Sequence, residues 1–367
     1  MEMSIRFPNL NLEFDYVGRS FSIFGFEITI YGFLIAAGML LGIFYVVQEA
    51  KRTDQNQDRY LDAVLISLAA GVVGARLFYV ICSWGLYKGN PMEIFNLRSG
   101  GYAFYGGLLG GFLAAGAFCR ALRLPFGEMA DTAVPGILIG QAVGRWGNFF
   151  NRESFGEYTD SLFAMELPLA AVRSSEVTVS MRENLIVRNG VSFISVHPVF
   201  LYESIWCIFL LVFLLLIRGK KRFQGEILML YLAGYGLGRL FFEYLRTDSL
   251  MLPGTRISAA LVISAALVLV LFPMICVRRI MVKKRADVRR KSRERKMRDL
   301  FLHRQTAEDA ANPEKTAAET EAAAEKESEE QTSAAADGQE SSDAAEKSES
   351  IPEEEWEKSK HAHINRS

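Results

Sequence analysis

The chain has 367 residues, and half of them are hydrophobic although 23% are charged. These values fit one molecule because the charge is segregated: the sequence is mostly apolar up to Val277 and almost purely polar from Arg278 onward. The formal net charge of −1 therefore averages a basic block and an acidic tail and describes neither. The four cysteines all lie inside apolar stretches, which excludes a disulfide framework and a cysteine-based metal site.

Several apolar stretches reach the roughly 20 residues that cross a bilayer core of about 30 Å. Backbone groups in lipid must bond internally, so such stretches form helices. We therefore predict an all-α polytopic membrane protein with seven transmembrane helices. They are Ile28–Val47, Leu61–Trp84, Phe104–Leu122, Met129–Trp146, Pro198–Ile217, Ile227–Leu245 and Ile257–Val277. Gly, Gln and Arg interrupt the fourth and sixth, which makes these two the weakest of the set.

The distribution of basic residues predicts the orientation. Lys and Arg cluster after the first, third, fifth and seventh stretches, as at Lys51, Arg120 and Lys220. Short loops rich in Lys and Arg remain in the cytoplasm. The N-terminus is therefore predicted outside and the C-terminus in the cytoplasm.

The connection between the fourth and fifth stretches, residues 147–196, is long enough to fold. It contains two β-prone runs on either side of Asn189-Gly190, and this dipeptide is a strong hairpin signal. We expect a small extracytoplasmic β-hairpin subdomain there.

Residues beyond the last stretch divide into two parts. Residues 278–304 are strongly basic and predict either a solvated helix that follows the last span or a site for anionic lipid. Residues 305–367 are rich in Ala, Glu, Ser and Lys and predict a disordered acidic tail. The predicted domains are thus a seven-span domain (1–277), the basic segment and the tail.

Ionisable residues inside membrane stretches are candidates for function. Here they are Arg76, Arg145, Glu203, Arg239 and Glu243. A single intramembrane arginine is as often a structural partner. Arg145 and Arg239, however, come from different stretches and both lie toward the external ends, so together they can form a bidentate clamp for an oxyanion such as phosphate.

Other polar residues complete this prediction. Glu243 follows Arg239 by four residues, so the two can pair on one helical face, and Glu203 is a second counter-charge. Asn148 and Asn151 can donate hydrogen bonds to phosphate or glycerol oxygens. Tyrosines near the stretch ends, Tyr31 and Tyr235 among them, also fit an interfacial aromatic belt. The many glycines nearby favour close helix packing, room for a lipid headgroup, or both.

Residues 144–156, "GRWGNFFNRESFG", resemble the signature of bacterial prolipoprotein diacylglyceryl transferases, Gly-Arg-x-Gly-Asn-Phe-x-Asn-x-Glu-x-x-Gly. Every fixed position is met. Further similar motifs follow in order, and they are "YG" at Tyr31, "GARLFYV" from Gly74, "FYGGLLGG" from Phe104, "HPVFLYE" from His197 and "GYGLGRLFFEYLR" ending at Arg246. The resemblance covers about residues 20–277.

The resemblance implies a reaction in the bacterial cell membrane, at its extracytoplasmic side. The diacylglyceryl group of phosphatidylglycerol moves to the lipobox cysteine of a prolipoprotein signal peptide, a thioether forms, and glycerol phosphate leaves. We predict catalytic roles for Arg145, Arg239, Tyr105 and Glu243. The predicted phosphatidylglycerol-binding residues are Arg145, Asn148, Asn151, Glu153, Gly156, Tyr31, Arg76, Tyr235 and Arg246.

One position departs from the family. Its "FHGGLIG"-type motif often carries a histidine that has been proposed as the base, and this chain has Tyr105 there. A phenol with a pKa near 10 is a poor base at neutral pH, so Tyr105 fits a positioning group better. His197 and Glu203 remain candidates for a base or for structural roles.

Two other classes of function compete with the transferase. A transporter is disfavoured because no internal repeat is visible and the polar residues gather toward one membrane face. A non-catalytic lipid-binding protein is the third possibility. No cofactor, metal or nucleic-acid partner is expected.

Overall fold

The structure is a computed structural model that describes residues 3–96, 100–248, 251, 254–255 and 257–311. The chain divides into two compact units, Met1–Lys284 and Arg285–Ser367. The part of the acidic tail from residue 312 onward lies outside the described residues.

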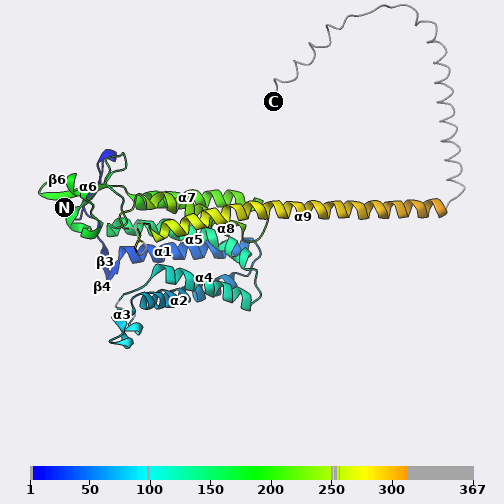
Figure 1. The fold of residues 1–367 in the computed structure, drawn as a ribbon, viewed down its shortest axis with the longest axis horizontal. Coiled ribbons are helices and arrows are strands. Elements are labelled where there is room, and N and C mark those ends of the chain that lie inside the picture. The colour runs from blue at the N-terminus through cyan, green and yellow to red at the C-terminus, as the bar shows by residue number, and fades with distance from the viewer. Residues whose placement is uncertain (1–2, 97–99, 249–250, 252–253, 256, 312–367) are drawn as a thin grey trace, which may run out of the picture. The chain divides into compact units, whose positions relative to one another are not determined.

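Long helices dominate the first unit (Figure 1). The described residues include α1 (Ile30–Arg52), α2 (Gln57–Cys82), α4 (Phe104–Ala121), α5 (Phe126–Asn151), α7 (Val199–Ile217), α8 (Glu226–Glu243) and α9 (Ala259–Ala311). Each coincides with one predicted stretch. Five of them, α1, α2, α4, α7 and α9, are long and apolar enough to cross a membrane. The other two, α5 and α8, match the two stretches that polar residues interrupt.

Local sequence signals explain where these helices begin and end. The Thr29 side chain accepts a hydrogen bond from the Gly32 amide at the start of α1, and Asn56 caps α2 in the same way. Helix α5 follows Pro125 and ends at Asn151, because the next residue, Arg152, has a left-handed backbone (φ 55°) that stops the helix. Helix α9 continues through the predicted basic segment, which is therefore helical.

Glycines let the helices of the first unit approach closely. Helix α1 packs along α5, and α2 packs along α4. A Cβ atom added at Gly136 would lie 2.6 Å from the Gly42 carbonyl oxygen, and one at Gly74 would lie 2.6 Å from that of Gly106. The predicted packing role of the glycines is confirmed at these crossings.

Large apolar side chains cover the outer surface of the helices. Leu40, Leu65 and Ile81 are 66–72% exposed. Exposed apolar surface of this extent is unusual for a protein in water but is expected where lipid replaces water.

A small antiparallel sheet lies at one end of the helices, with strand order β2-β1-β5-β7-β6 (Figure 1). Its strands are β1 (Ile5–Phe7), β2 (Leu12–Phe14), β5 (Met165–Pro168), β6 (Ile186–Arg188) and β7 (Val191–Val196). The predicted hairpin is confirmed: Arg188 pairs with Val191, and the turn residues Asn189 and Gly190 both have positive φ.

Residues before Ile28 were given no strands by the sequence, and here the structure differs. The N-terminal segment adds β1 and β2 to the sheet, and β3 (Ser20–Ile23) forms a second hairpin with β4 (Phe26–Thr29). Buried Arg152 attaches this segment to the end of α5, because its guanidinium donates to the Met3 carbonyl at 2.7 Å and to the Val17 carbonyl at 2.6 Å.

Candidate active site

Three segments meet where the signature ends. The Gly156 amide donates to the His197 carbonyl oxygen at 2.9 Å, and Glu157 donates to that of Leu245 at 2.9 Å. A Cβ atom at Gly156 would lie 2.7 Å from the His197 Cβ and 2.8 Å from the Leu245 oxygen. Only glycine fits there. This contact brings the end of α5, the start of α7 and the end of α8 together.

Glu203 on α7 lies at the centre of the charged groups and is 4% exposed. Its Oε2 atom is 2.7 Å from the Arg145 Nη1 atom of α5, and its Oε1 atom is 2.9 Å from the Arg239 Nη1 atom of α8. Arg246 follows at 3.6 Å from the same Oε1 atom. One carboxylate therefore holds guanidinium groups from two different helices and from the segment after α8.

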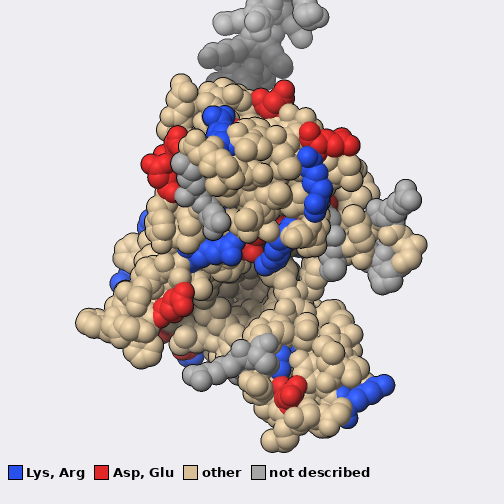
Figure 2. Space-filling view, turned by 90° about the vertical axis from the view of Figure 1, so that its left-hand side faces the viewer, with Lys and Arg blue, Asp and Glu red and all other residues tan. Residues whose placement is uncertain are grey.

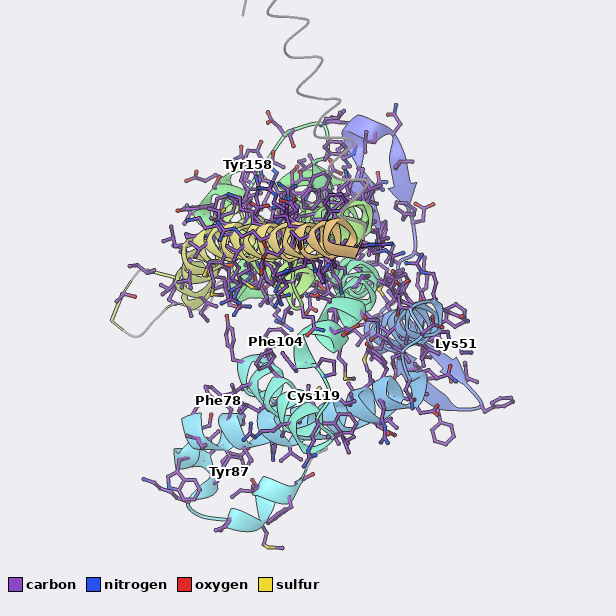
Figure 3. All side chains as sticks on the ribbon, turned by 90° about the vertical axis from the view of Figure 1, so that its right-hand side faces the viewer. Lys51, Phe78, Tyr87, Phe104, Cys119 and Tyr158 are labelled. Carbon is purple, nitrogen blue, oxygen red and sulfur yellow. The ribbon has the colours of Figure 1, made fainter. Side chains whose placement is uncertain are left out.

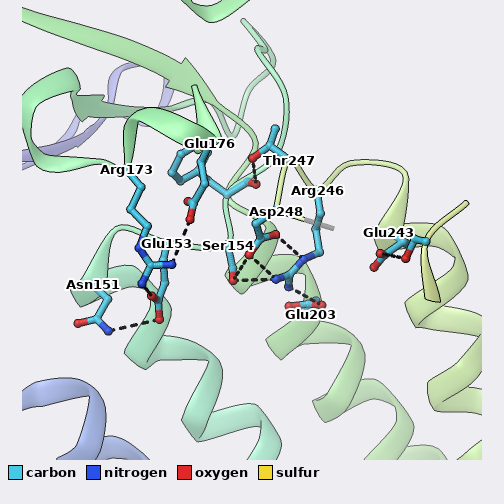
Figure 4. A network of polar contacts seen from close by, with 12 residues as sticks. Asn151, Glu153, Ser154, Arg173, Glu176, Glu203, Glu243, Arg246, Thr247 and Asp248 are labelled. Atoms are coloured by element: carbon cyan, nitrogen blue, oxygen red, sulfur yellow. Dashed lines mark hydrogen bonds and ion pairs between the residues drawn. The ribbon is translucent and has the colours of Figure 1, made fainter. Parts of the chain in front are cut away.

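Each arginine also has a partner of its own. Arg239 pairs with Glu243 at 2.7 Å, as their spacing predicts. Arg145 donates to the Tyr235 hydroxyl at 3.1 Å. Arg246 pairs with Asp248 at 2.8 Å and donates to the Ser154 hydroxyl at 2.8 Å (Figure 4). The guanidinium positions are thus fixed from several sides.

We call Arg145, Arg239, Arg246, Glu203, Glu243 and Asp248 the arginine–carboxylate cluster. Its formal charges balance, so the three cations lie close together before any ligand binds. A small pocket opens at the cluster, lined by Arg145, Glu203, Trp206, Cys207, Tyr235, Gly238, Arg239 and Phe242. On the face of the molecule shown in Figure 2, basic and acidic side chains lie side by side at the edge of a hollow.

The chemistry available here is that of an oxyanion site. A guanidinium has five N–H donors, and those that do not contact a carboxylate can bind phosphate oxygens. Little reorganisation is needed because the carboxylates already hold the groups in place.

Residues 19–277 match the family model described as "Prolipoprotein diacylglyceryl transferase". The chain belongs to this family. A relative from Clostridioides difficile (strain 630), named phosphatidylglycerol–prolipoprotein diacylglyceryl transferase, is 40% identical over 239 residues, or 65% of this chain and 87% of the relative. Proteins of the same name from Bacillus mycoides (strain KBAB4; 38%, 67% of this chain, 87% of the relative) and Bacillus cereus (strain ATCC 14579; 39%, 69% and 89%) are similar.

The family membership makes the chain a membrane-embedded transferase of lipoprotein maturation, so the transporter and the non-catalytic lipid-binding protein are not favoured. The family signature, residues 144–156, covers the last two turns of α5 and the loop that follows it. Arg145 lies in the last two turns of α5, and Asn148 lies on its final turn. Gly147 lies against the Tyr31 ring, since a Cβ atom there would be 2.7 Å from the Tyr31 Cδ2 atom.

A second branch of polar contacts extends from the signature (Figure 4). Asn151 donates to Glu153 at 3.3 Å, and Arg173 bridges Glu153 and Glu176, each at 3.3 Å. Burial, together with the negative charge of Asp248, raises the pKa of Glu176. Among the described residues, the ion-pair partner of Glu153 is Arg173 of this branch, not an arginine of the cluster.

Arg76 and Tyr105 lie elsewhere. Arg76 on α2 donates to five backbone carbonyls between residues 93 and 101, at distances of 2.5–3.1 Å. The structure therefore gives it the task of holding that loop and does not bring it to the arginine–carboxylate cluster. Tyr105 lies in the first turn of α4, with its ring 5.8 Å from that of Phe104. Figure 3 shows Phe104 in the α2–α4 part of the molecule.

His197 lies beside the cluster in the segment before α7. Its Nδ1 atom is 3.4 Å from the Tyr202 hydroxyl, and its backbone bonds to Gly156 and Glu157. Burial lowers the pKa of the imidazole. These contacts describe a residue that joins segments, and they do not include the arginines.

Sequence reasoning missed Ser154, Asp248 and Arg173. Ser154 occupies a variable position of the signature, and Asp248 follows the last recognised motif by two residues. The "RTD" spacing of Arg246 and Asp248 was the available signal, because a carboxylate two residues after an arginine can fold back onto it.

Proposed function

We propose that this protein transfers the diacylglyceryl group from phosphatidylglycerol to the lipobox cysteine of a prolipoprotein, and that the arginine–carboxylate cluster performs the transfer. The observation that carries the proposal is the convergence of Arg145 and Arg239 on the two oxygens of Glu203. Two guanidinium groups that share one carboxylate lie close enough to contact a second small oxyanion, the lipid phosphate, with their remaining N–H donors.

The reaction breaks one bond and forms one. The thiolate sulfur attacks the glyceryl carbon that bears the phosphate, a C–S bond forms, and the C–O bond to phosphate breaks. The electron pair leaves with the phosphate oxygen, whose charge increases. Arg145 and Arg239 would stabilise that charge. Arg246 would help to fix the Glu203 carboxylate and would bind the lipid phosphate from the same side.

The thiol must lose its proton before it attacks, since the thiolate is the nucleophile. The reaction balances because the released glycerol phosphate carries one more negative charge than the lipid phosphate and can take up one proton. Tyr105 and His197 have no described contact with the cluster, so we assign them positioning roles. Glu203 and Glu243 are the carboxylates that contact the two catalytic arginines. Glu243 would orient Arg239, and Ser258, which donates to Glu243, would orient that carboxylate in turn.

The remaining candidates would bind the lipid headgroup around this centre. Asn148, Asn151 and Glu153 would contact the glycerol or phosphate oxygens, together with Tyr31, which lies against Gly147, and Tyr235, which bonds to Arg145. Gly156 would act by permitting the close approach of three segments. Arg76 would act indirectly through the loop that it holds.

We propose seven membrane-spanning helices in residues 1–277, with α5 and α8 as the two polar spans. The cluster and the sheet lie at the same end of these helices. At the opposite end, Lys51 and Arg120 lie in the last turns of α1 and α4, and Lys220 lies in the turn that follows α7. The distribution of basic residues supports a cluster that faces the extracytoplasmic side of a bacterial plasma membrane, and a cytoplasmic basic segment and acidic tail.

The test is transfer of labelled diacylglycerol from phosphatidylglycerol to a lipobox peptide. Arg145→Lys and Arg239→Lys should each reduce turnover by at least about 100-fold, because lysine cannot contact two oxygens of a phosphate in a fork. Arg188→Lys is the matched control, since Arg188 pairs with Glu166 in the sheet at 3.2 Å. Near-normal turnover of both cluster variants would sink the proposed mechanism.

A further inference from the structure

The second unit contains an exposed basic helix that the family match does not cover. Residues 285–304 include nine Lys or Arg and three Asp or Glu. Every residue of this range is exposed in the structure. The charge of this surface therefore faces solvent or a partner.

The basic residues are not spread evenly around the helix. Arg285, Arg289, Arg293 and Lys296 follow one another at spacings of four, four and three, so they form a stripe along one face. Asp287 and Glu294 lie on the opposite side, where Glu294 pairs with Arg290 at 3.5 Å. Within the described range, the four stripe residues have no ion pair with a carboxylate.

The stripe is unfavourable for the helix by itself. Like charges at positions i and i+4 repel each other and destabilise an exposed helix. Between residues 283 and 296 the apolar side chains are Ala286 and Val288, so this part has no apolar face for the membrane interface. A polyanion along the stripe would remove the repulsion.

The same chain carries such a polyanion. Residues 312–367 include 16 Asp or Glu and six Lys or Arg, and they begin directly after α9 ends at Ala311. The helix from Arg285 to Ala311 is about 39 Å long, at 1.5 Å per residue. At about 3.3–3.6 Å per residue, fewer than about 15 extended residues cover that distance.

We propose that the acidic residues of 312–367 bind the basic stripe of their own chain. Both segments belong to the second unit, and their covalent connection raises the effective concentration of one near the other to about the millimolar range. At this effective concentration, many weak ion pairs are enough to keep the acidic segment on the stripe, and salt weakens them. While the acidic segment is bound, the stripe is closed to other polyanions.

A zero-length carbodiimide cross-linker applied to the full-length protein in neutral detergent tests this contact. Lys296 lies on the stripe, and Lys291 lies on the opposite side of the same exposed helix. At about 50 mM salt, Lys296 should couple to carboxylates of 312–367 in the monomer at several times the yield of Lys291, and about 500 mM salt should abolish the difference. Equal yields at the two lysines, or coupling in dimers alone, would overturn the proposal.

A fluorescent single-stranded oligonucleotide, used as a generic polyanion, measures whether the stripe is accessible. The chain truncated after Ala311 should bind this probe at least about tenfold more tightly than the full chain, because Lys and Arg side chains dominate such binding. In the truncated chain, Arg285→Gln, Arg289→Gln and Arg293→Gln together should remove the gain. Lys291→Gln, Arg295→Gln and Arg298→Gln remove the same charge from the opposite side and should retain it. Equal probe affinity of the full and truncated chains would contradict the proposal.

Discussion

At the scale of single residues, Glu203 is the carboxylate that joins the arginines of the proposed site. It contacts three arginines, whereas Glu243 contacts Arg239 and the Ser258 hydroxyl. Removing one partner of a buried ion pair leaves uncompensated charge and typically costs about 3–5 kcal/mol. Glu203→Gln should therefore reduce kcat more than Glu243→Gln and lower the thermal midpoint further. Turnover assays and melting curves of both variants in the same detergent would show this, and a reversed order would contradict the central position of Glu203.

His197 can be tested through pH. Its pKa is lowered in the folded protein, so below the ordinary value of about 6.5 the unfolded chain binds the proton more readily. Stability should rise with pH through the window between the lowered pKa and 6.5, and should fall as the pH decreases through it. His197→Gln should flatten this dependence in melting curves and reduce kcat by less than about tenfold, or about 1.4 kcal/mol. Loss of the acidic limb of the rate profile in this variant, where activity rises with pH as the base loses its proton, would instead identify His197 as the base.

At the scale of helices and strands, close glycine contacts determine the packing. Gly136→Ala should separate α5 from α1, because the new Cβ atom would lie 2.6 Å from a backbone oxygen that cannot move alone. Overpacking of this kind costs about 1–3 kcal/mol. Gly116→Ala on α4 is the control, since no atom lies within 4 Å of its Cβ position, and it should be neutral or stabilising. Comparable destabilisation of both variants would contradict the assignment of the effect to the α1–α5 contact, because helix propensity alone favours alanine at both positions.

The elements differ in how far the sequence could predict them. Long apolar runs predicted the main helices, and Asn189-Gly190 predicted the turn of β6 and β7, because these signals are local. Strands β1 and β2 have three residues each, which is too short for an alternating pattern to be recognised. Strand β1 joins the sheet through β5, where Arg6 lies opposite Glu166, 160 residues further along the chain. The segment is also held by Arg152, which no local pattern connects to Val17.

The site shows the same division. Arg239 and Glu243 were predicted as a pair because four residues of helix separate them. The meeting of Arg145 with Arg239 was expected only from their depth and charge, and Glu203 turned out to be the group that joins them. Asp248 had the short spacing from Arg246 as its local signal, whereas Ser154 had none, because the loop backbone before Gly156 sets its position.

At the scale of the whole molecule, the proposed orientation makes a prediction that does not depend on activity. Phe24, in the turn between β3 and β4, is 98% exposed, and Ser292 lies in the exposed basic helix. In a variant with its four native cysteines replaced, Phe24→Cys should react with a membrane-impermeant maleimide on intact cells, while Ser292→Cys should react only after the membrane is opened. Retained transferase activity in the cysteine-free background is the control. Labelling of Ser292→Cys on intact cells would contradict the proposed orientation, which rests on the distribution of basic residues, and would place the arginine–carboxylate cluster on the cytoplasmic side.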